Sequence, residues 1–209
     1  MIPLVIVGAG GFGREVLDII EAINSVDPTF DFLGFLDDAP VPSPLIGERR
    51  ASVIGKVERL AQLDTHYLIG ISSGESRKRI DILATAAGRT AAVAVHPAAT
   101  MGAHVLLGPG SIVTAGVRLT TNIRLGRHVH VNINATVGHD CRLGDYVTIN
   151  PGVNVSGTVS IGECAMLGTG SCVNQGLSIG AETIVGAGAA VVQDLPPGVV
   201  AVGIPARPR

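Results

Sequence analysis

The chain has 209 residues; 46% are hydrophobic but only 3% are aromatic, and 28 are glycine. Its net charge of −2 gives no basic field that would attract nucleic acid or an anionic membrane surface. Three cysteines without a CxxC pair, and no apolar run of about 18 residues, predict a reduced cytoplasmic protein that does not span a membrane.

The first 88 residues have the pattern of an α/β domain. The opening apolar run is too short and lacks the basic leader of a signal peptide, so it predicts a buried strand. Strands are predicted over 4–7, 32–36 and 67–71, helices over 14–23, 58–62 and 76–87, and a loop over 39–50.

A glycine-rich turn joins the first strand to the first helix, and two acids end the second strand. The glycines are Gly8, Gly10, Gly11 and Gly13, and the acids are Asp37 and Asp38. This order outlines a Rossmann-like βαβ unit that holds phosphate at the helix N-terminus. Because 88 residues make only about half of a dinucleotide fold, the pattern favours a nucleoside diphosphate over NAD. The alternative is a small packing domain whose glycines only permit a tight turn.

From Val95 onward, every sixth residue is a large aliphatic, in 17 consecutive positions. They are Val95, Met101, Leu107, Val113, Leu119, Leu125, Val131, Val137, Leu143, Ile149, Val155, Ile161, Leu167, Val173, Ile179, Val185 and Val191. A smaller inward residue is expected four positions after each. A period of six fits neither an α-helix nor an ordinary strand. It predicts a parallel β-helix over residues 89–209, a triangular prism in which three hexads make one coil and successive coils stack on one another.

The residue directly after each aliphatic is often Gly or Asn, as at Gly102, Gly126 and Asn132. Since these types tolerate a left-handed backbone, we expect them at the corners of the prism.

Five segments together resemble the sialic acid O-acetyltransferase group, which includes the N-acetyltransferases of nucleotide-linked amino sugars. They are GAGGFGREV, FLDD, SSGESRKRI, VGHDCRLGDYV and VGIPARP. The resemblance covers essentially the whole chain and implies a left-handed β-helix, acetyl-CoA as acyl donor, a nucleotide-sugar acceptor, no metal, and a homotrimer. The outward-facing residues expected to be buried between subunits are Ile112, Ile133 and Val173.

By this resemblance His139 is the catalytic base, followed by Asp140. A neutral imidazole is suited to accept the proton of an attacking amine or hydroxyl near physiological pH. The sequence leaves the role of Asp140 open, because adjacent side chains on an extended chain diverge. It either orients the His139 ring, receives the acceptor, or hydrates the corner.

The resemblance also implies the binding residues. The nucleotide sugar is expected at Gly8, Gly10, Gly11, Gly13, Asp37, Asp38 and Arg77. Acetyl-CoA is expected in a groove between neighbouring prisms at Gly157, Thr169 and Ala187, with Thr148 standing where the family has a second histidine.

Three alternatives to N-acetylation stay open. One is O-acetylation of sialic acid or another sugar hydroxyl. A second is a zinc carbonic anhydrase, which needs three convergent histidines, whereas only His128 and His130 lie close together in the sequence. A third is a β-helix scaffold without catalytic activity.

Overall fold

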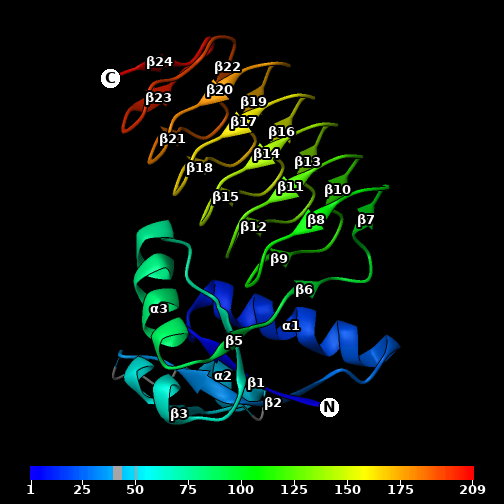
Figure 1. The fold of residues 1–209 in the computed structure, drawn as a ribbon, viewed down its shortest axis with the longest axis vertical. Coiled ribbons are helices and arrows are strands. Elements are labelled where there is room, and N and C mark those ends of the chain that lie inside the picture. The colour runs from blue at the N-terminus through cyan, green and yellow to red at the C-terminus, as the bar shows by residue number, and fades with distance from the viewer. Residues whose placement is uncertain (40–43, 50) are drawn as a thin grey trace. The chain divides into compact units, whose positions relative to one another are not determined.

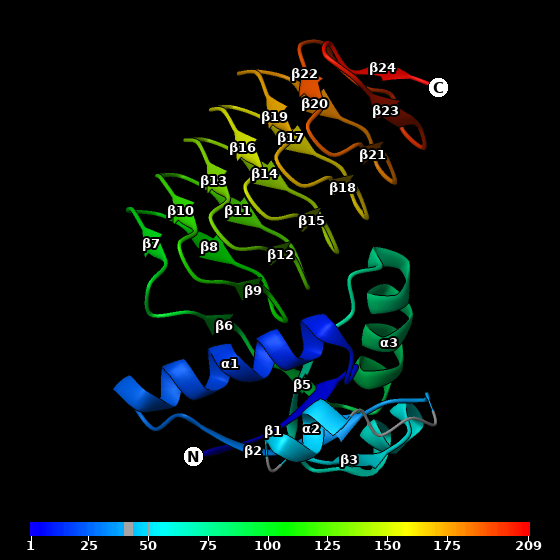
Figure 2. The same ribbon diagram turned by 180° about the vertical axis from the view of Figure 1, so that it is seen from behind.

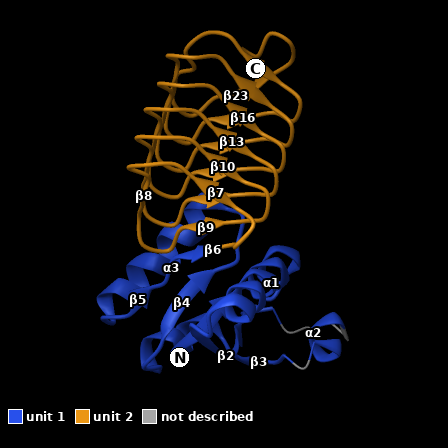
Figure 3. Ribbon diagram, turned by 90° about the vertical axis from the view of Figure 1, so that its right-hand side faces the viewer, with its two compact units in different colours: residues 1–94 blue, residues 95–209 orange. Residues whose placement is uncertain are grey.

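The computed structural model describes residues 1–39, 44–49 and 51–209. Two compact units follow each other along the chain, residues 1–94 and 95–209 (Figure 3). The sequence placed this division after residue 88. The structural boundary lies later because the strand at Thr90–Ala91 still pairs within the sheet of the first unit. Within the described ranges, no helix is long and apolar enough to cross a membrane.

The first unit contains a parallel five-stranded sheet in the order β3-β2-β1-β4-β5, flanked by helices (Figure 1). Its strands are β1 (Ile2–Val7), β2 (Phe30–Leu36), β3 (Val53–Gly55), β4 (His66–Ile69) and β5 (Thr90–Ala91). Its helices are α1 (Gly11–Val26), α2 (Pro44–Glu48), the 3-10 helix η1 (Val57–Gln62) and α3 (Gly74–Ala86). With β1 between β2 and β4, the carboxyl ends of these three strands meet at one edge of the sheet, where α/β proteins bind their ligands.

The predicted strands and helices of this unit are present, with two differences. The segment 58–62 lies within a 3-10 helix, and β3 and β5 were not predicted. The prediction of a loop over 39–50 was wrong over 44–48, which form α2; residues 40–43 and 50 lie outside the described residues.

The second unit is a left-handed parallel β-helix whose short strands form three sheets, one on each face of a prism. The first face contains β7 (Thr100–Met101), β10 (Arg118–Leu119), β13 (Thr136–Val137), β16 (Asn154–Val155), β19 (Cys172–Val173) and β22 (Ala190–Val191). The second contains β8 (Leu106–Leu107), β11 (Arg124–Leu125), β14 (Arg142–Leu143), β17 (Ser160–Ile161) and β20 (Ser178–Ile179). Figure 2 shows the strands of the first face succeeding one another along the stack.

The third face contains β6 (Ala94–Val95), β9 (Ile112–Val113), β12 (His130–Val131), β15 (Thr148–Ile149), β18 (Met166–Leu167), β21 (Ile184–Val185), β23 (Val200–Val202) and β24 (Arg207–Pro208). Strand β24 is the exception to the parallel pattern, because it runs antiparallel to β23. Partners on each face up to β21 are separated by three hexads of sequence, for example Leu119 opposite Val137. The predicted stacking of one coil of three hexads on the next is therefore confirmed.

The aliphatic column forms the interior of the prism. Its members from Val113 to Val191 belong to one buried cluster, together with the smaller residues four positions later, such as Ala135 and Cys141. Of the three residues expected at a subunit interface, Val173 is wrong because it points inward and is 1% exposed. Ile112 is buried, and Ile133 is 45% exposed.

The expectation that the Gly or Asn directly after each aliphatic has left-handed backbone was wrong. The left-handed residue stands third after the aliphatic, as at Asn122, Asn134 and Asp140, with φ of 55°, 58° and 61°. The glycines directly after the aliphatics are needed for a different reason. A Cβ at Gly138 would lie 2.6 Å from the backbone nitrogen of Gly157 in the next coil. These glycines allow successive coils to approach closely.

Candidate active site

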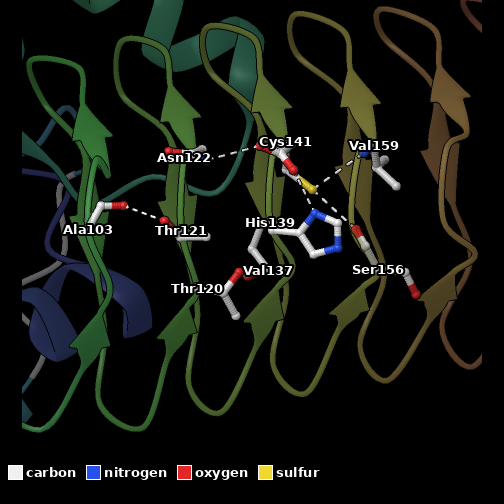
Figure 4. A network of polar contacts seen from close by, with 10 residues as sticks. Ala103, Thr120, Thr121, Asn122, Val137, His139, Cys141, Ser156 and Val159 are labelled. Atoms are coloured by element: carbon white, nitrogen blue, oxygen red, sulfur yellow. Dashed lines mark hydrogen bonds and ion pairs between the residues drawn. The ribbon is translucent and has the colours of Figure 1, made fainter.

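His139 stands at the corner where β13 ends and β14 begins, between the first and second faces. Its counterparts at the same corner are Thr121 in the preceding coil and Gly157 in the following coil. The carbonyl of His139 accepts a hydrogen bond from the Thr158 amide at 2.7 Å, which ties this corner to the next coil. The imidazole itself is exposed, and Figure 4 shows its ring reaching toward the coil of Ser156.

The Asp140 carboxylate contacts the His139 ring: Asp140 Oδ2 lies 2.7 Å from His139 Nδ1. Adjacent side chains on an extended strand would diverge, but Asp140 has φ of 61°, and this left-handed conformation turns its carboxylate back toward the ring. The question that the sequence left open therefore has a geometric answer: Asp140 is in position to orient the ring.

This contact determines which ring nitrogen is available. Because a carboxylate accepts hydrogen bonds, Nδ1 carries the proton and donates a hydrogen bond to Asp140, which leaves the lone pair on Nε2. Nε2 faces Gly157, where an added Cβ would lie only 2.4 Å away. Glycine at 157 thus leaves the space in which the imidazole lies.

The charges of the pair fit this arrangement. The hydrogen bond with His139, and second the hydrogen bond from Asn122, hold the pKa of Asp140 below its usual value. Asp140 therefore stays ionised beside the ring at neutral pH. In contrast, burial raises the pKa of the Cys141 thiol, whose Sγ donates to the Ser156 carbonyl at 3.2 Å. Cys141 is a protonated part of the core rather than a nucleophile.

A second candidate site lies in the first unit, in a cavity of about 370 Å³ at the carboxyl ends of the strands. Its polar lining residues are Asp37, Asp38, Glu58, Ser76 and Arg79, with Gly8 at the turn and an apolar wall of Val57, Ile71, Ile80 and Leu83. This mixture of an apolar wall with a few convergent polar groups is typical of a small-molecule site.

The two acids also brace the surrounding backbone. Asp37 Oδ2 accepts a hydrogen bond from the Ala9 amide in the glycine turn at 2.7 Å. Asp38 Oδ1 accepts one from the Val57 amide at 3.0 Å.

The four glycines of the turn have different roles. Gly8 has φ of 97°. At Gly13, a Cβ would lie 1.9 Å from the Gly8 carbonyl oxygen, so a side chain there would push helix α1 away from the strand. Gly10 and Gly11 have open space where a Cβ would be, so packing does not require them to be glycine. They leave the backbone at the start of α1 accessible.

Arg77, which the resemblance placed at the nucleotide sugar, is fully buried. Its Nη1 donates to the carbonyls of Ile71 and Ser72 at 3.0 and 2.7 Å, which holds the turn between β4 and α3. Arg79 instead lines the cavity. The sequence contained a signal for it, because Ser76, Arg79, Ile80 and Leu83 follow the spacing of one helix face.

The residues expected at acetyl-CoA lie in different places within one chain. Gly157 lies against the His139 ring. Thr169 and Ala187 stand on successive coils at the corner between the third and first faces, where the Thr169 carbonyl accepts from the Gly188 amide at 2.9 Å. Thr148 is 2% exposed in β15 on the third face.

An open groove of about 850 Å³ runs along the second face. Leu106, Arg124, Arg142 and Ser160 line it from successive coils, together with Leu195 and Pro197 near the end of the stack.

The histidine pair of the zinc alternative does not form a metal site. The ring of His128 stacks on Tyr146 with a centroid distance of 6.0 Å, whereas His130 lies on the third face. Across ranges 1–39, 44–49 and 51–209, no group of three or more His, Cys, Asp or Glu residues is arranged to hold a metal ion.

Known proteins match both units. A family model described as the PglD N-terminal domain matches residues 3–81. The GDP-perosamine N-acetyltransferase of Escherichia coli O157:H7 is 33% identical over 137 residues, which cover 65% of this chain and 62% of that protein. The match thus spans less than two thirds of that curated relative.

Two solved structures match over nearly their whole length. The acetyltransferase domain of PglB from Neisseria gonorrhoeae FA1090 is 32% identical, has a TM-score of 0.90 and is covered completely, as is this chain. PerB from Caulobacter crescentus, in complex with CoA and GDP-perosamine, is 34% identical with a TM-score of 0.87. This match covers 99% of this chain and 97% of PerB.

Proposed function

Since this chain belongs to the nucleotide-amino-sugar N-acetyltransferase family, we propose that it transfers the acetyl group of acetyl-CoA to the amino group of a sugar carried on a nucleoside diphosphate. His139 acts as the general base. The observation that carries this proposal is the 2.7 Å contact between His139 Nδ1 and Asp140, which leaves Nε2 free to accept a proton.

The reaction proceeds by direct attack. As the neutral amine of the acceptor attacks the thioester carbonyl, its nitrogen loses a proton to His139 Nε2. The tetrahedral intermediate then expels the CoA sulfur, and the imidazolium returns the proton to that sulfur. Asp140 remains a carboxylate throughout and stabilises the imidazolium while it exists.

The acceptor's nucleotide binds in the cavity of the first unit. Gly10 and Gly11 leave the start of α1 open to the diphosphate, while Gly8 lines the cavity and Gly13 lets the helix pack on the strand. Asp37 and Asp38 border the nucleoside. We assign the positive charge at this site to Arg79 rather than Arg77, because Arg79 lines the cavity while Arg77 is fully buried.

Acetyl-CoA binds between prisms of a homotrimer. Gly157 of one protomer, beside its own His139, and Thr169 and Ala187 of a neighbour would contact the cofactor. Thr148 is not assigned to this contact, because it is 2% exposed. The open groove along the second face, which Leu106, Arg124 and Arg142 line from successive coils, is a surface on which a neighbouring protomer could pack. Light scattering of the purified protein, which distinguishes one protomer from three, tests this arrangement.

The three cysteines, which form no CxxC pair, support a reducing compartment as the place of action.

The decisive experiment measures CoA thiol release from acetyl-CoA with GDP-, UDP- and dTDP-linked amino sugars and with sialic acid. We expect turnover with a nucleotide amino sugar, and a fall in kcat of roughly 10²-fold or more in His139→Ala. Turnover with sialic acid alone would instead support O-acetylation. An unchanged rate in His139→Ala would overturn the assignment of the base. Thermal unfolding of the variant serves as the control for folding.

A further inference from the structure

The carboxylate of Asp140 is held from two sides, by residues on successive coils. Its Oδ2 contacts His139 Nδ1 at 2.7 Å, and its Oδ1 accepts a hydrogen bond from Asn122 Nδ2 at 3.2 Å. Asn122 lies one coil before Asp140, at the same corner of the prism. Figure 4 shows Asn122 on its coil and His139 on the next.

Asn122 is conformationally suited to this place. Like Asp140 it stands third after an inward aliphatic and has left-handed backbone, with φ of 55°. Asparagine tolerates this conformation better than most residues. Because both residues share the same backbone conformation at the same corner, their side chains extend in parallel and meet.

We propose that Asn122 is a positioning residue for the reaction: its amide fixes the Asp140 carboxylate in the plane that orients the His139 ring. This inference rests on the proposed function of His139 as general base. Without the amide, only the bond to His139 restrains the carboxylate, which is then free to turn about its terminal torsion. The imidazole consequently loses its fixed direction and its defined tautomer.

Few groups around the His139 ring ionise, so the effect of a substitution at Asn122 can be detected in a titration of His139. The coil before it contributes Thr120, Thr121 and Asn122 at this corner, and the coil after it contributes Ser156, Gly157 and Thr158; none of these ionises near neutral pH. The ionisable groups are Asp140 and the Cys141 thiol. Arg124 and Arg142 begin the strands that follow the two corners.

The chain offers a matched control at Asn134. It also stands third after an aliphatic, has φ of 58°, and donates its backbone amide to the coil before it at 3.1 Å, as Asn122 does. Asn134 lies at another corner, on the far side of strand β13 from His139. Glycine and aspartate both accept left-handed backbone, so substitution by either at both positions tests the side chain with little strain.

The first test is kinetic. We expect Asn122→Gly to lower kcat by roughly three- to tenfold, the effect of one lost hydrogen bond, with KM for acetyl-CoA unchanged. Asn134→Gly should stay within about twofold of the wild type. An Asn122→Gly rate equal to that of Asn134→Gly would overturn the proposal.

The second test needs no acceptor. NMR titration of the His139 imidazole should show that Asn122→Asp raises its pKa by about half a unit or more, because a second carboxylate stabilises the imidazolium. The acid limb of the pH–rate profile should move upward by the same amount, while Asn134→Asp leaves both unchanged. An unshifted His139 pKa in Asn122→Asp would refute the contact. A shifted pKa together with an active His139→Ala enzyme would retain the contact but refute the proposed base.

Discussion

The two units differ in what determines where a residue lies and in which side chains fill their interiors. In the β-helix, a residue's place follows from its number alone, because each position recurs once per coil on the same face or corner. In the first unit, a place depends on packing between segments distant in sequence, such as Gly8, Gly13 and Gly70. The interiors differ as well. All four phenylalanines lie in the first unit, whereas the β-helix has a single phenol ring, at Tyr146. A repeated backbone needs uniform aliphatic columns, while a sheet covered by helices needs side chains of various sizes.

The largest effect on stability should follow from adding a methyl group where the first unit is tightest. In Gly13→Ala the new Cβ would lie 1.9 Å from the Gly8 carbonyl, so the free energy of unfolding should fall by about 3 kcal/mol. Gly11→Ala, at the start of the same helix with open space around it, is the matched control and should not lose stability. Urea unfolding measures both. Equal stability of the two variants would mean that helix α1 does not pack closely on the strand.

The same methyl group in the β-helix should affect activity instead of folding. In Gly157→Ala the nearest atoms are those of the exposed His139 ring, which can move away. We therefore expect kcat to fall by roughly 10²-fold through misplacement of the base, with a nearly unchanged melting temperature. The assay is CoA release alongside thermal unfolding. A stable, fully active Gly157→Ala enzyme would show that the His139 ring does not act as the base from this position.

A smaller effect should separate two arginines of helix α3. Arg79→Ala should raise KM for the nucleotide sugar by roughly tenfold, as expected for one lost charge-assisted hydrogen bond, without loss of stability. Arg77→Ala should instead lower the free energy of unfolding by about 2 kcal/mol, because its buried guanidinium bonds the two carbonyls of the turn between β4 and α3. Steady-state kinetics and urea unfolding of both variants measure these effects. A higher KM in Arg77→Ala together with a loss of stability in Arg79→Ala would instead assign the nucleotide-sugar contact to Arg77.

The smallest effect concerns the pH dependence of stability at the His139 corner. The pKa of Asp140 is lowered in the folded state, so its contribution is present above the ordinary carboxyl pKa and is lost as pH falls through the folded value. Asp140→Asn should therefore melt slightly below the wild type at pH 6, and the difference should shrink as the pH falls below the ordinary carboxyl pKa and through the lower folded value. Because Asp140 is exposed, solvent screens this contribution. A difference that grows as the pH falls would contradict the direction of the shift.

What could be predicted from the sequence follows the same division. The period of six predicted the inward column, which is buried from Val113 to Val191, the stacking, and the corner position of His139. Met101, in the first coil, departs from the column because it is 44% exposed. The period did not give the left-handed residue at each corner, since that depends on how coils approach one another and not on composition. For this reason the contact of Asp140 with His139 was left open, and Asn122 was missed.

In the first unit the pattern located the strands and the glycine turn but not the lining of the cavity. The choice between Arg77 and Arg79 depends on how helix α3 is rotated against the sheet. Its apolar spacing is weak, and only Arg77, Ile80, Asp81 and Ala84 are buried. Helix α2 was missed because Pro44 and Gly47 within it are typical of turns.

The left-handed residue third after each inward aliphatic has an evolutionary consequence. Since the third residue after each aliphatic from Met101 to Val185 already has left-handed backbone, a histidine followed by an aspartate needs no new loop to form the pair found at His139 and Asp140. Point mutations at two adjacent codons suffice to create such a pair, provided that the same corner of the next coil has a glycine, as Gly157 does here, to make room for the ring. The prism can therefore hold the same histidine–aspartate arrangement at the corresponding corner of another coil, and duplication or loss of a complete coil elsewhere leaves the geometry of the pair unchanged.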